Sequence, residues 1–440
     1  MKTTIYFLSN LKIDFQKRKF YSLVILALTV LSCTNRSDAL QVTNPQLPYD
    51  MRSGLIPSRL TIAMWDYSWL NQHYSGGYFE DFNKVTDELI ERGFNTVRIE
   101  AFPLIIDRLD SINQMVTIEG NPLATWGASD IDRKHDVVKE LISFMKIAKG
   151  KGLYVILSTW NPDCKEFPNL HKEYANRELY MHAWEQVLDI LKKNNLHDQV
   201  LYVDIDQEFP NFSPFKKKIK ELADLVKPSS EILAKELAKH NCNDLKKQEW
   251  NQAQMVFVHD LLQETLLNYH IKYPGLRFTF SFTDHWNEFR AMNLNLLDVL
   301  ELHIWMEQSE RFSTRTRFNE LKWDRGDHDY KEYAERVDQT LSSIRPMLLK
   351  DLHNRLEYAK SWSEELGAPL TTTEAWGPWW HMDNKELDWK WLYDWCEEGM
   401  DLSAEYGFWG STPWNFSHPY WNNWSNTTWY KRVNTNFKEY

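Results

Sequence analysis

The chain has 440 residues and a formal net charge of −11, with 43% hydrophobic and 26% charged residues, which is typical of a globular protein. This length suits one large barrel or two modest domains, and only 15 glycines and 16 prolines exclude a fibrous or low-complexity protein. The acidic balance lacks the basic surface that nucleic acids need, so we expect no nucleic-acid partner.

The first 32 residues are predicted to be a signal peptide. Lys17-Arg18-Lys19 precede an apolar run from Phe20 to Leu31, which is too short to span a bilayer as a helix and is typical of a signal-peptide core. The run ends in Val30-Leu31-Ser32-Cys33, which resembles the lipobox of bacterial lipoproteins. That resemblance implies a diacylglycerol on the Cys33 thiol, anchoring the protein to the bacterial cell envelope at the periplasmic or surface face of the outer membrane. The alternative is an ordinary secretory signal with cleavage nearby.

Residues 33–55 are polar and are predicted to be a tether, and residues 56–440 are predicted to be one domain. In this domain, apolar runs of strand length alternate with amphipathic helical stretches, which indicates parallel βαβ units. The expected strands are Leu60–Trp65, Asn95–Ala101, Leu153–Thr159, Val200–Asp206, Arg277–Thr283, Val299–Trp305, Pro369–Glu374 and Gly407–Ser411. The helical stretches include Phe79–Arg92, Asp136–Lys149, Met181–Lys193, Ala253–Tyr269 and Leu349–Leu366.

Eight such strands predict an α/β protein with a single (β/α)₈ (TIM) barrel and long loops. The alternative is a doubly wound open sheet, but no glycine-rich nucleotide loop follows the first strand. The lysine-rich segment Phe212–Glu249 does not fit the alternation. It is predicted to be a helical insertion after the fourth strand, with a solvated basic face.

Two glutamates stand at the ends of predicted strands. The fourth strand runs on into Glu208, and the seventh ends at Glu374. Because the carboxyl ends of barrel strands carry the catalytic loops, both side chains are expected to face one cleft. A pair of carboxylates is what cleavage of a glycosidic bond requires, since one protonates the leaving oxygen and the other attacks the anomeric carbon or activates water.

The surroundings of both glutamates resemble the cellulase-like (β/α)₈ glycoside hydrolases, the clan that includes family 5 cellulases and mannanases. More narrowly, the chain resembles the group described as sugar-binding cellulase-like proteins, over about Ile56–Trp424. His197–Asp204 matches the approach to the fourth strand, and Thr373–Gly377 matches the end of the seventh. The resemblance implies retaining hydrolysis of β-linked oligo- or polysaccharides, with Glu208 as acid/base and Glu374 as nucleophile.

The resemblance implies further substrate-site residues. Arg98 on the second strand would brace the nucleophile, His303 at the end of the sixth would face the substrate, and Trp409 on the eighth would form a platform under the sugar. The chain departs from the clan in two places: Gln207 replaces the Asn before the acid/base, and Trp305 replaces a Tyr that often donates to the nucleophile. Both departures leave the identity of the sugar open.

Other loop residues complete the predicted site. Trp160 and Trp376 are expected to bind sugar, as members of a larger set at the predicted carboxyl-end loops of which about half only fill space. The rest of that set is Trp65, Trp69, Trp126, Trp286, Trp379, Trp380, Trp414 and Trp421. Asp284 is a spare carboxylate and a candidate hydrogen-bond partner for the sugar. The loop histidines His73, His285, His381 and His418 lack metal-ligand spacing, as do Cys164, Cys242 and Cys396, so no metal or other cofactor is expected.

Two alternative functions follow from the same residues. Asp204-Ile205-Asp206-Gln207-Glu208 also resembles the acidic motif of family 18 chitinases, in which the acetamido group of the substrate is the nucleophile. That alternative would leave Glu374 without a role. The other alternative is a glycan-binding lipoprotein on the same fold that has lost turnover, because fold alone does not fix function.

Overall fold

The computed structural model describes residues 59–121, 125–223, 250–321, 327–379, 381, 383–414 and 417–440. The predicted signal peptide, Cys33 and the polar tether lie outside the described residues, as do Trp380, Cys242 and most of the predicted lysine-rich insertion, of which α9 (Lys216–Ala223) is described. Within the described residues, no helix combines the length and the apolar character needed to cross a membrane. Cys164 and Cys396 are buried free thiols.

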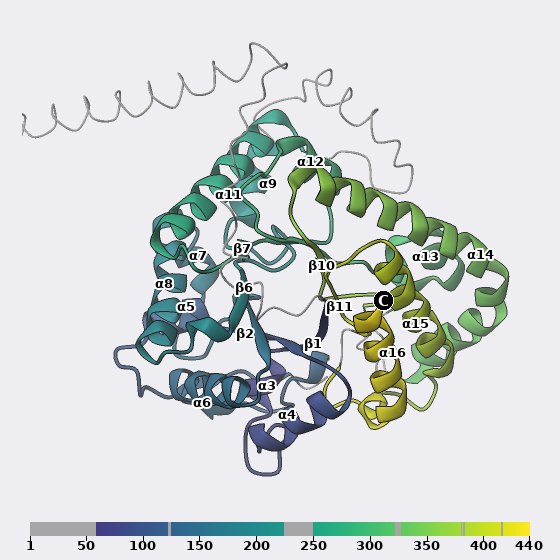
Figure 1. Cartoon of the computed structure of the whole chain (residues 1–440), viewed down its shortest axis with the longest axis horizontal. Helices are drawn as coiled ribbons and strands as arrows, with labels where there is room; N and C mark the ends of the chain where they lie inside the picture. The colour runs from purple at the N-terminus through teal and green to yellow at the C-terminus, as the bar shows by residue number, and fades with distance from the viewer. Residues whose placement is uncertain are drawn as a thin grey trace, which may run out of the picture. The chain divides into compact units, whose positions relative to one another are not determined.

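Parallel strands form a barrel at the centre of the unit Pro57–Tyr440, as predicted (Figure 1). Their order is β7-β6-β5-β2-β1-β11-β10-β9-β8, and only Phe280 separates β7 from β8, which together fill the fifth barrel position. The strands are β1 (Leu60–Asp66), β2 (Thr96–Glu100), β5 (Tyr154–Ser158), β6 (Val200–Asp204), β7 (Phe278–Thr279), β8 (Ser281–Phe282), β9 (Leu300–Leu302), β10 (Leu370–Thr372) and β11 (Gly410–Ser411). They are buried on both faces, apart from Tyr154 at the start of β5, which explains their near-continuous apolar runs.

The predicted fifth strand is interrupted. β7 pairs with β6 through Phe278 and Thr279, whereas β8 pairs with β9 through Ser281 and Phe282. The Asp204 side chain explains the break, because its Oδ1 accepts the Ser281 backbone N–H at 2.9 Å in place of a strand partner.

Helices surround the barrel (Figure 1). The principal ones are α4 (Phe82–Glu91), α6 (Val137–Gly150), α8 (Arg177–Lys193), α11 (Gln252–Lys272), α12 (Trp286–Met292), α14 (Asp327–Leu366), α15 (Lys390–Glu405) and α16 (Thr427–Glu439). Short helices in the connections are α3 (Ser68–Asn71), α5 (Pro103–Arg108), α7 (Leu170–Glu173) and α13 (Glu310–Thr316), with 3₁₀ turns at η2 (Thr125–Gly127), η3 (His197–Gln199), η4 (Met306–Gln308), η5 (Phe318–Glu320) and η6 (Asn422–Ser425). Side-chain caps fix several starts: Asp81 caps α4, Asp136 caps α6, and Asn251 with Gln254 forms a capping box on α11.

Two elements differ from the expectation. Helix α14 begins at Asp327, well before the predicted Leu349, and passes through Pro346. In addition, an antiparallel hairpin of β3 (Val116–Ile118) and β4 (Arg133–His135) occupies the connection after β2, with η2 between its strands. This hairpin brings Trp126 to the site described below.

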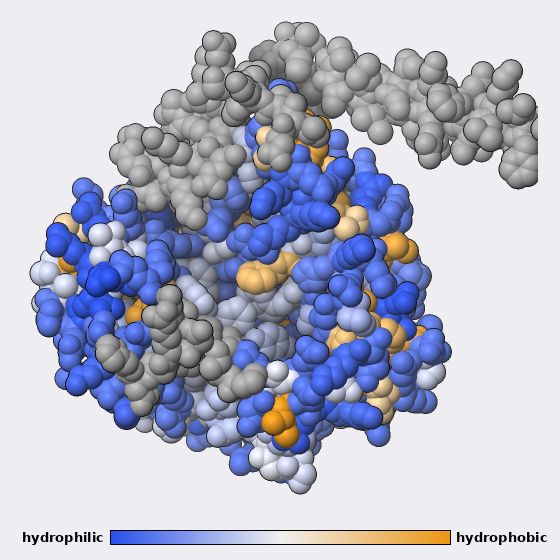
Figure 2. Space-filling model, turned by 180° about the vertical axis from the view of Figure 1, so that it is seen from behind, coloured by the Kyte–Doolittle hydropathy of each residue, from blue (hydrophilic) through white to orange (hydrophobic). Residues whose placement is uncertain are grey.

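The strands follow one another clockwise in Figure 1. Because βαβ connections are right-handed, a clockwise order means that the view is from the amino ends of the strands. Figure 2 therefore looks onto their carboxyl ends, where side chains of pale, intermediate hydropathy gather in a hollow near the middle of a hydrophilic face. This is the face on which (β/α)₈ enzymes carry their sites.

Candidate active site

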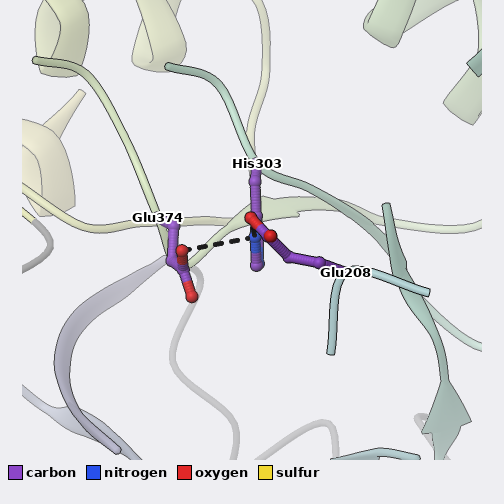
Figure 3. A group of neighbouring side chains, drawn as sticks. All are labelled: Glu208, His303 and Glu374. Atoms are coloured by element: carbon purple, nitrogen blue, oxygen red, sulfur yellow. Dashed lines mark hydrogen bonds and ion pairs between the residues drawn. The ribbon is translucent and has the colours of Figure 1, made fainter. Parts of the chain in front are cut away.

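The two predicted glutamates meet at one histidine ring (Figure 3). Glu208 follows β6, Glu374 follows β10 and His303 follows β9. His303 Nδ1 lies 2.9 Å from Glu208 Oε1 and 3.4 Å from Glu374 Oε2. One oxygen of each carboxylate and one ring nitrogen all lie within 4.8 Å of one another. The chain thus brings its two strand-end carboxylates into a single space.

Hydrogen-bond direction fixes the protonation of His303. Arg98 Nη1 lies 3.3 Å from His303 Nε2, and a guanidinium can only donate, so Nε2 accepts and the proton resides on Nδ1. Burial lowers the pKa of His303, which keeps the ring neutral. The Nδ1–H therefore donates to Glu208. Although the three groups are close enough to hold a metal ion, a protonated Nδ1 has no lone pair to offer one.

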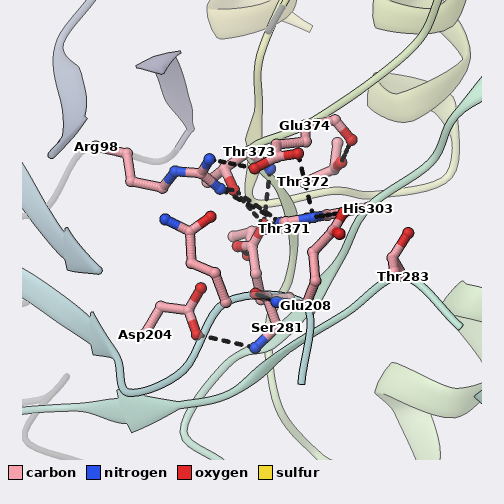
Figure 4. Close-up of polar contacts among 12 residues, drawn as sticks. Arg98, Asp204, Glu208, Ser281, Thr283, His303, Thr371, Thr372, Thr373 and Glu374 are labelled. Carbon is pink, nitrogen blue, oxygen red and sulfur yellow. Dashed lines mark hydrogen bonds and ion pairs between the residues drawn. The ribbon is translucent and has the colours of Figure 1, made fainter. Parts of the chain in front are cut away.

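Arg98 on β2 is held rigidly by Asp66 at the end of β1. The guanidinium donates to both Asp66 oxygens, at 3.0 and 3.1 Å, and is completely buried. It also donates to Glu374 Oε1 and to the Thr373 hydroxyl, as Figure 4 shows. Trp160 Nε1 donates to the same Asp66 at 2.8 Å. Arg98 is thus placed beside Glu374, as expected from the sequence.

The backbone of Glu208 is fixed by the interrupted fifth strand. Ser281 Oγ accepts the Glu208 N–H at 3.0 Å, and Ser281 O accepts the Phe209 N–H at 3.0 Å (Figure 4 shows Ser281 beside Glu208). Glu208 itself has a φ of 48°, in the left-handed region that costs a non-glycine residue conformational energy. Trp305 Nε1 lies 3.4 Å from Glu208 Oε1, so the Trp that replaces the clan's Tyr faces the predicted acid rather than the predicted nucleophile.

Both carboxyl groups have raised pKa values, and Arg98 contacts only one of them. Burial raises the pKa of Glu208 to about 7. Burial also raises the pKa of Glu374 to about 7, against the opposing effects of His303 and Arg98. The guanidinium contacts Glu374 and not Glu208. When the two carboxyl groups share a single proton, Glu374 is therefore the ionised member and Glu208 carries the proton.

Comparison with known proteins fits this geometry. A sequence model of the family described as "Sugar-binding cellulase-like" matches residues 62–438. The chain belongs to the sugar-binding cellulase-like family. No relative is found among curated proteins.

Several solved structures are similar to this cellulase-like protein. A crystal structure described as a putative glycoside hydrolase from Parabacteroides distasonis superposes with a TM-score of 0.72 and 24% identity, over 87% of this chain and 94% of that one. A glycoside hydrolase family 5 mannosidase from Rhizomucor miehei gives a TM-score of 0.46 and 11% identity, over 87% and 94% of the two chains. A family 5 enzyme from Streptomyces cattleya in complex with GlcNAc gives 0.43 and 12%, over 81% and 70%. The likeness to the Parabacteroides distasonis structure, at 24% identity, shows the fold alone.

Gln207, Trp160 and Trp305 join the carboxylates of the cellulase-like site. Gln207 is buried, and its Nε2 lies 2.7 Å from Ser158 Oγ and 3.4 Å from Asp66 Oδ1. Its amide nitrogen is therefore engaged inside the protein. Asp284 lies beside the same loop, with its Oδ2 3.3 Å from Asn211 Nδ2.

The structure does not bring Trp376 and Trp409 to the carboxylates. Trp376 is 1% exposed, packs against Gly399 of α15 and donates to Thr412 O, so it is a core residue. Trp409 precedes β11, and Leu60 at the start of β1 bonds to its carbonyl oxygen, so it lies toward the amino ends of the strands. The predicted eighth strand, Gly407–Ser411, includes Trp409, but β11 begins only at Gly410, after this residue.

The other loop tryptophans divide by burial. Most are 4% exposed or less and fill space beneath the loops, namely Trp65, Trp69, Trp286, Trp414 and Trp421. Trp126 and Trp379 are partly exposed, and each packs against other aromatic rings at the mouth.

Three residues of the site were missed from the sequence. Asp66 is one residue beyond the end of the predicted first strand, so extending that strand by one position would have found it. Tyr67 lies close enough to Asp66 and Glu374 for both to raise its pKa. Glu307 follows β9, accepts the Trp379 N–H at 3.2 Å and is near enough to Glu208 to interact with it. A lone Tyr or Glu in a loop carries no pattern that sequence reasoning can use.

Buried carboxyl groups with raised pKa values surround the pair. Burial raises the pKa of Glu100 to about 8, of Glu307 to about 8 and of Asp204 to about 7. Together with Glu208, Glu374 and Asp206, whose pKa values burial also raises, these carboxyl groups bind protons in the folded chain at a pH where the unfolded chain has released them.

These groups predict a stability that falls with pH. Between about pH 6.5 and pH 8.5 the folded chain binds more protons than the unfolded chain, so the free energy of unfolding decreases as pH rises through the folded pKa values. His381 and His418, whose pKa values burial lowers to about 3, are neutral in the folded chain. In the unfolded chain they lose their remaining protons between about pH 6.5 and pH 7.5, so they oppose the trend only at the low end of this range. We expect thermal unfolding to show a lower Tm at the higher pH, and Glu100→Gln to reduce the difference. A Tm that rises with pH would contradict the assignment.

Proposed function

We propose that this protein is a retaining glycoside hydrolase of β-linked glycans, with Glu208 as general acid/base and Glu374 as nucleophile. The observation that carries the proposal is the approach of one oxygen from each carboxylate to within 4.8 Å. Retaining enzymes place the two carboxyl groups about 5–5.5 Å apart, whereas inversion requires about 6.5–9.5 Å to admit a water molecule. The short separation favours direct attack by a carboxylate.

Each residue then has a role in two steps. Glu374, ionised beside Arg98, attacks the anomeric carbon while Glu208 gives its proton to the leaving oxygen, so a glycosyl ester forms as the glycosidic bond breaks. Glu208, now ionised, takes a proton from water, and the water oxygen displaces Glu374 from the sugar. His303 Nδ1–H donates to Glu208 Oε1 and also lies close to Glu374 Oε2. This hydrogen bond can therefore shift to whichever carboxylate carries the negative charge in each step. The mechanism needs no cofactor.

The proposed substrate is an oligo- or polysaccharide, for which the partly exposed rings at the mouth offer stacking faces. The proposal includes attachment to the cell envelope through lipidated Cys33, which the mass of the mature N-terminal peptide would test. The sequence of residues 1–55 supports this part of the proposal.

A second candidate is sugar binding without turnover, and the description of the family as sugar-binding favours it. A chitinase-type mechanism has less support. The carboxylate of Asp206 bonds to Asn161 Nδ2 at 3.1 Å, and such a mechanism gives no role to a Glu374 placed against Glu208 and Arg98.

Stereochemistry and trapping test the proposal. We expect proton NMR of a β-glycoside digest to show the β-anomer as the first product. A 2,4-dinitrophenyl 2-deoxy-2-fluoro-β-glycoside of a sugar that is cleaved should add one fluorosugar mass to the peptide that contains Glu374. The fluorine slows both steps, and the dinitrophenolate leaving group speeds only the formation of the ester, so the ester accumulates. First appearance of the α-anomer would show inversion, and turnover without any label on Glu374 would assign the nucleophile elsewhere.

A further inference from the structure

Aromatic rings from separate loops meet above the site. Trp126, carried by the β3–β4 hairpin, contacts Tyr67 after β1 with ring centroids 6.5 Å apart, and Trp160 after β5 at 5.2 Å. It also contacts Trp379, in the loop after β10, at 6.3 Å in an edge-to-face arrangement. We call Tyr67, Trp126 and Trp379 the aromatic wall.

The aromatic wall crosses the mouth of the barrel. Around the barrel, β2 and β10 are separated by β1 and β11, so the contact between Trp126 and Trp379 passes over the ends of these two strands. The chain after β11 fills the space there with buried side chains, since Trp414 is 1% and Trp421 is 4% exposed.

The aromatic wall stands on the side of Glu374. Tyr67 interacts electrostatically with Glu374 and Asp66, and Trp379 is five residues beyond Glu374. On the other side, Phe212 follows Glu208, is 37% exposed and packs its ring on Trp160. Since the nucleophile must meet the anomeric carbon of the sugar whose bond breaks, that sugar sits against the aromatic wall. The leaving group extends past Glu208.

We propose that the aromatic wall makes the site a pocket for the terminal, non-reducing sugar of a glycan, so that the enzyme removes end units instead of cutting within chains. This inference rests on the proposed hydrolase function and names its substrate class. For a chain to continue past the bound sugar, it would have to pass between Trp126 and Trp379. Edge-to-face rings at 6.3 Å are in contact and leave no room for a pyranose.

Capped substrates test the pocket. The probes are 4-nitrophenyl β-D-glucoside, β-D-mannoside and β-D-galactoside, each with and without a 4,6-O-benzylidene cap that occupies the position of a preceding sugar. We expect the wild type to cleave at least one uncapped probe with a kcat/KM at least about tenfold above that of its capped form, since even a small misfit in a pocket changes rates by that much.

Removing a ring of the aromatic wall should weaken the preference for uncapped over capped probes. Trp126→Ala and Trp379→Ala should each raise the ratio of capped to uncapped kcat/KM about tenfold or more, while Trp126→Phe should change it less. Tyr78→Ala is the matched control, because Tyr78 is a 52% exposed ring that packs on Tyr420 outside the aromatic wall. Equal cleavage of capped and uncapped probes by the wild type would overturn the pocket.

Binding separates this inference from the proposed hydrolysis. If the wild type cleaves no probe, hydrolysis of these sugars is refuted, and titration of tryptophan fluorescence with the same probes then decides on the pocket. Binding of an uncapped probe in preference to its capped form would support the pocket. Equal binding of both forms, or binding of neither, would overturn it.

Discussion

Glu374→Gln is expected to abolish glycoside hydrolysis and to leave sugar binding within a few-fold of the wild type. The amide keeps the shape of the side chain and an oxygen that can accept from Arg98, so the pocket persists. It has no charge with which to attack the anomeric carbon. The loss of kcat should exceed the roughly 10²–10⁴-fold contribution of general acid–base catalysis, because the covalent step itself disappears. Turnover of an aryl β-glycoside and fluorescence titration measure the two quantities.

Glu208→Gln is the matched variant for this experiment. It should slow glycosides with poor leaving groups by about 10²–10⁴-fold and spare 2,4-dinitrophenyl glycosides in the first step, because that leaving group needs no proton. If wild type and Glu374→Gln bind alike and neither turns over, the sugar-binding function is correct. Hydrolysis of N-acetylglucosaminides that survives in Glu374→Gln would support the chitinase-type mechanism.

Arg98→Met is expected to lower the free energy of unfolding by about 3–5 kcal/mol, the usual result of removing one partner from a buried ionic cluster. Asp66 and Glu374 would both be left buried without their guanidinium, with side-chain exposures of 2% and 4%. Activity should fall as well, since Glu374 would take up a proton at neutral pH. Urea unfolding followed by fluorescence measures the first effect, and the pH profile of kcat measures the second.

A second substitution distinguishes electrostatics from lost packing. Asp66→Asn in the Arg98→Met background removes one unpaired charge and should recover part of the stability, whereas on its own it should destabilise. Lys84→Met is the control, because Lys84 is exposed and lies 3.9 Å from the partly buried Glu88, so this ion pair should contribute less than about 1 kcal/mol. If Lys84→Met and Arg98→Met lowered the free energy of unfolding equally, the buried cluster would contribute no more to stability than a surface ion pair.

Most of the barrel could be predicted because its strands are buried on both faces. Runs such as Val200–Asp204 and Thr96–Glu100 are apolar over their whole length apart from the residues that face the axis, so their positions appear in the sequence. The break at Phe280 could not be predicted, since it depends on the side chain of Asp204, which reaches Ser281 from a neighbouring strand. No local pattern records such a contact.

The carboxylate pair and Arg98 were predictable because each follows or occupies a strand whose direction is known. Among the aromatic residues, Trp160 and Trp305 were predicted at the site, but the others were not sorted correctly. Trp126 and Trp376 have similar loop settings in the sequence, yet Trp126 reaches the mouth and Trp376 is buried against Gly399. Whether each ring is exposed or buried depends on the hairpin after β2 and on the close approach of α15, and both of these are long-range features.

The floor of the site is a fully buried carboxylate, Glu301 on β9. Tyr202 donates to its Oε2 at 2.7 Å, and the Thr373 backbone N–H and hydroxyl both donate to its Oε1 at 2.7 Å. Because the Thr373 hydroxyl has one hydrogen and gives it to Glu301, its oxygen can only accept from Arg98.

These contacts fix which group donates in each hydrogen bond from Glu301 up to His303. With Arg98 donating to both Thr373 and His303, the ring is left with its proton on Nδ1, facing the two carboxylates. Arg98 thus sets the tautomer of His303, and Glu301 orients the Thr373 hydroxyl that accepts from the same guanidinium. Grafting Glu208, His303 and Glu374 onto another barrel without Arg98 would transfer the reacting groups but leave the His303 proton free to occupy either ring nitrogen.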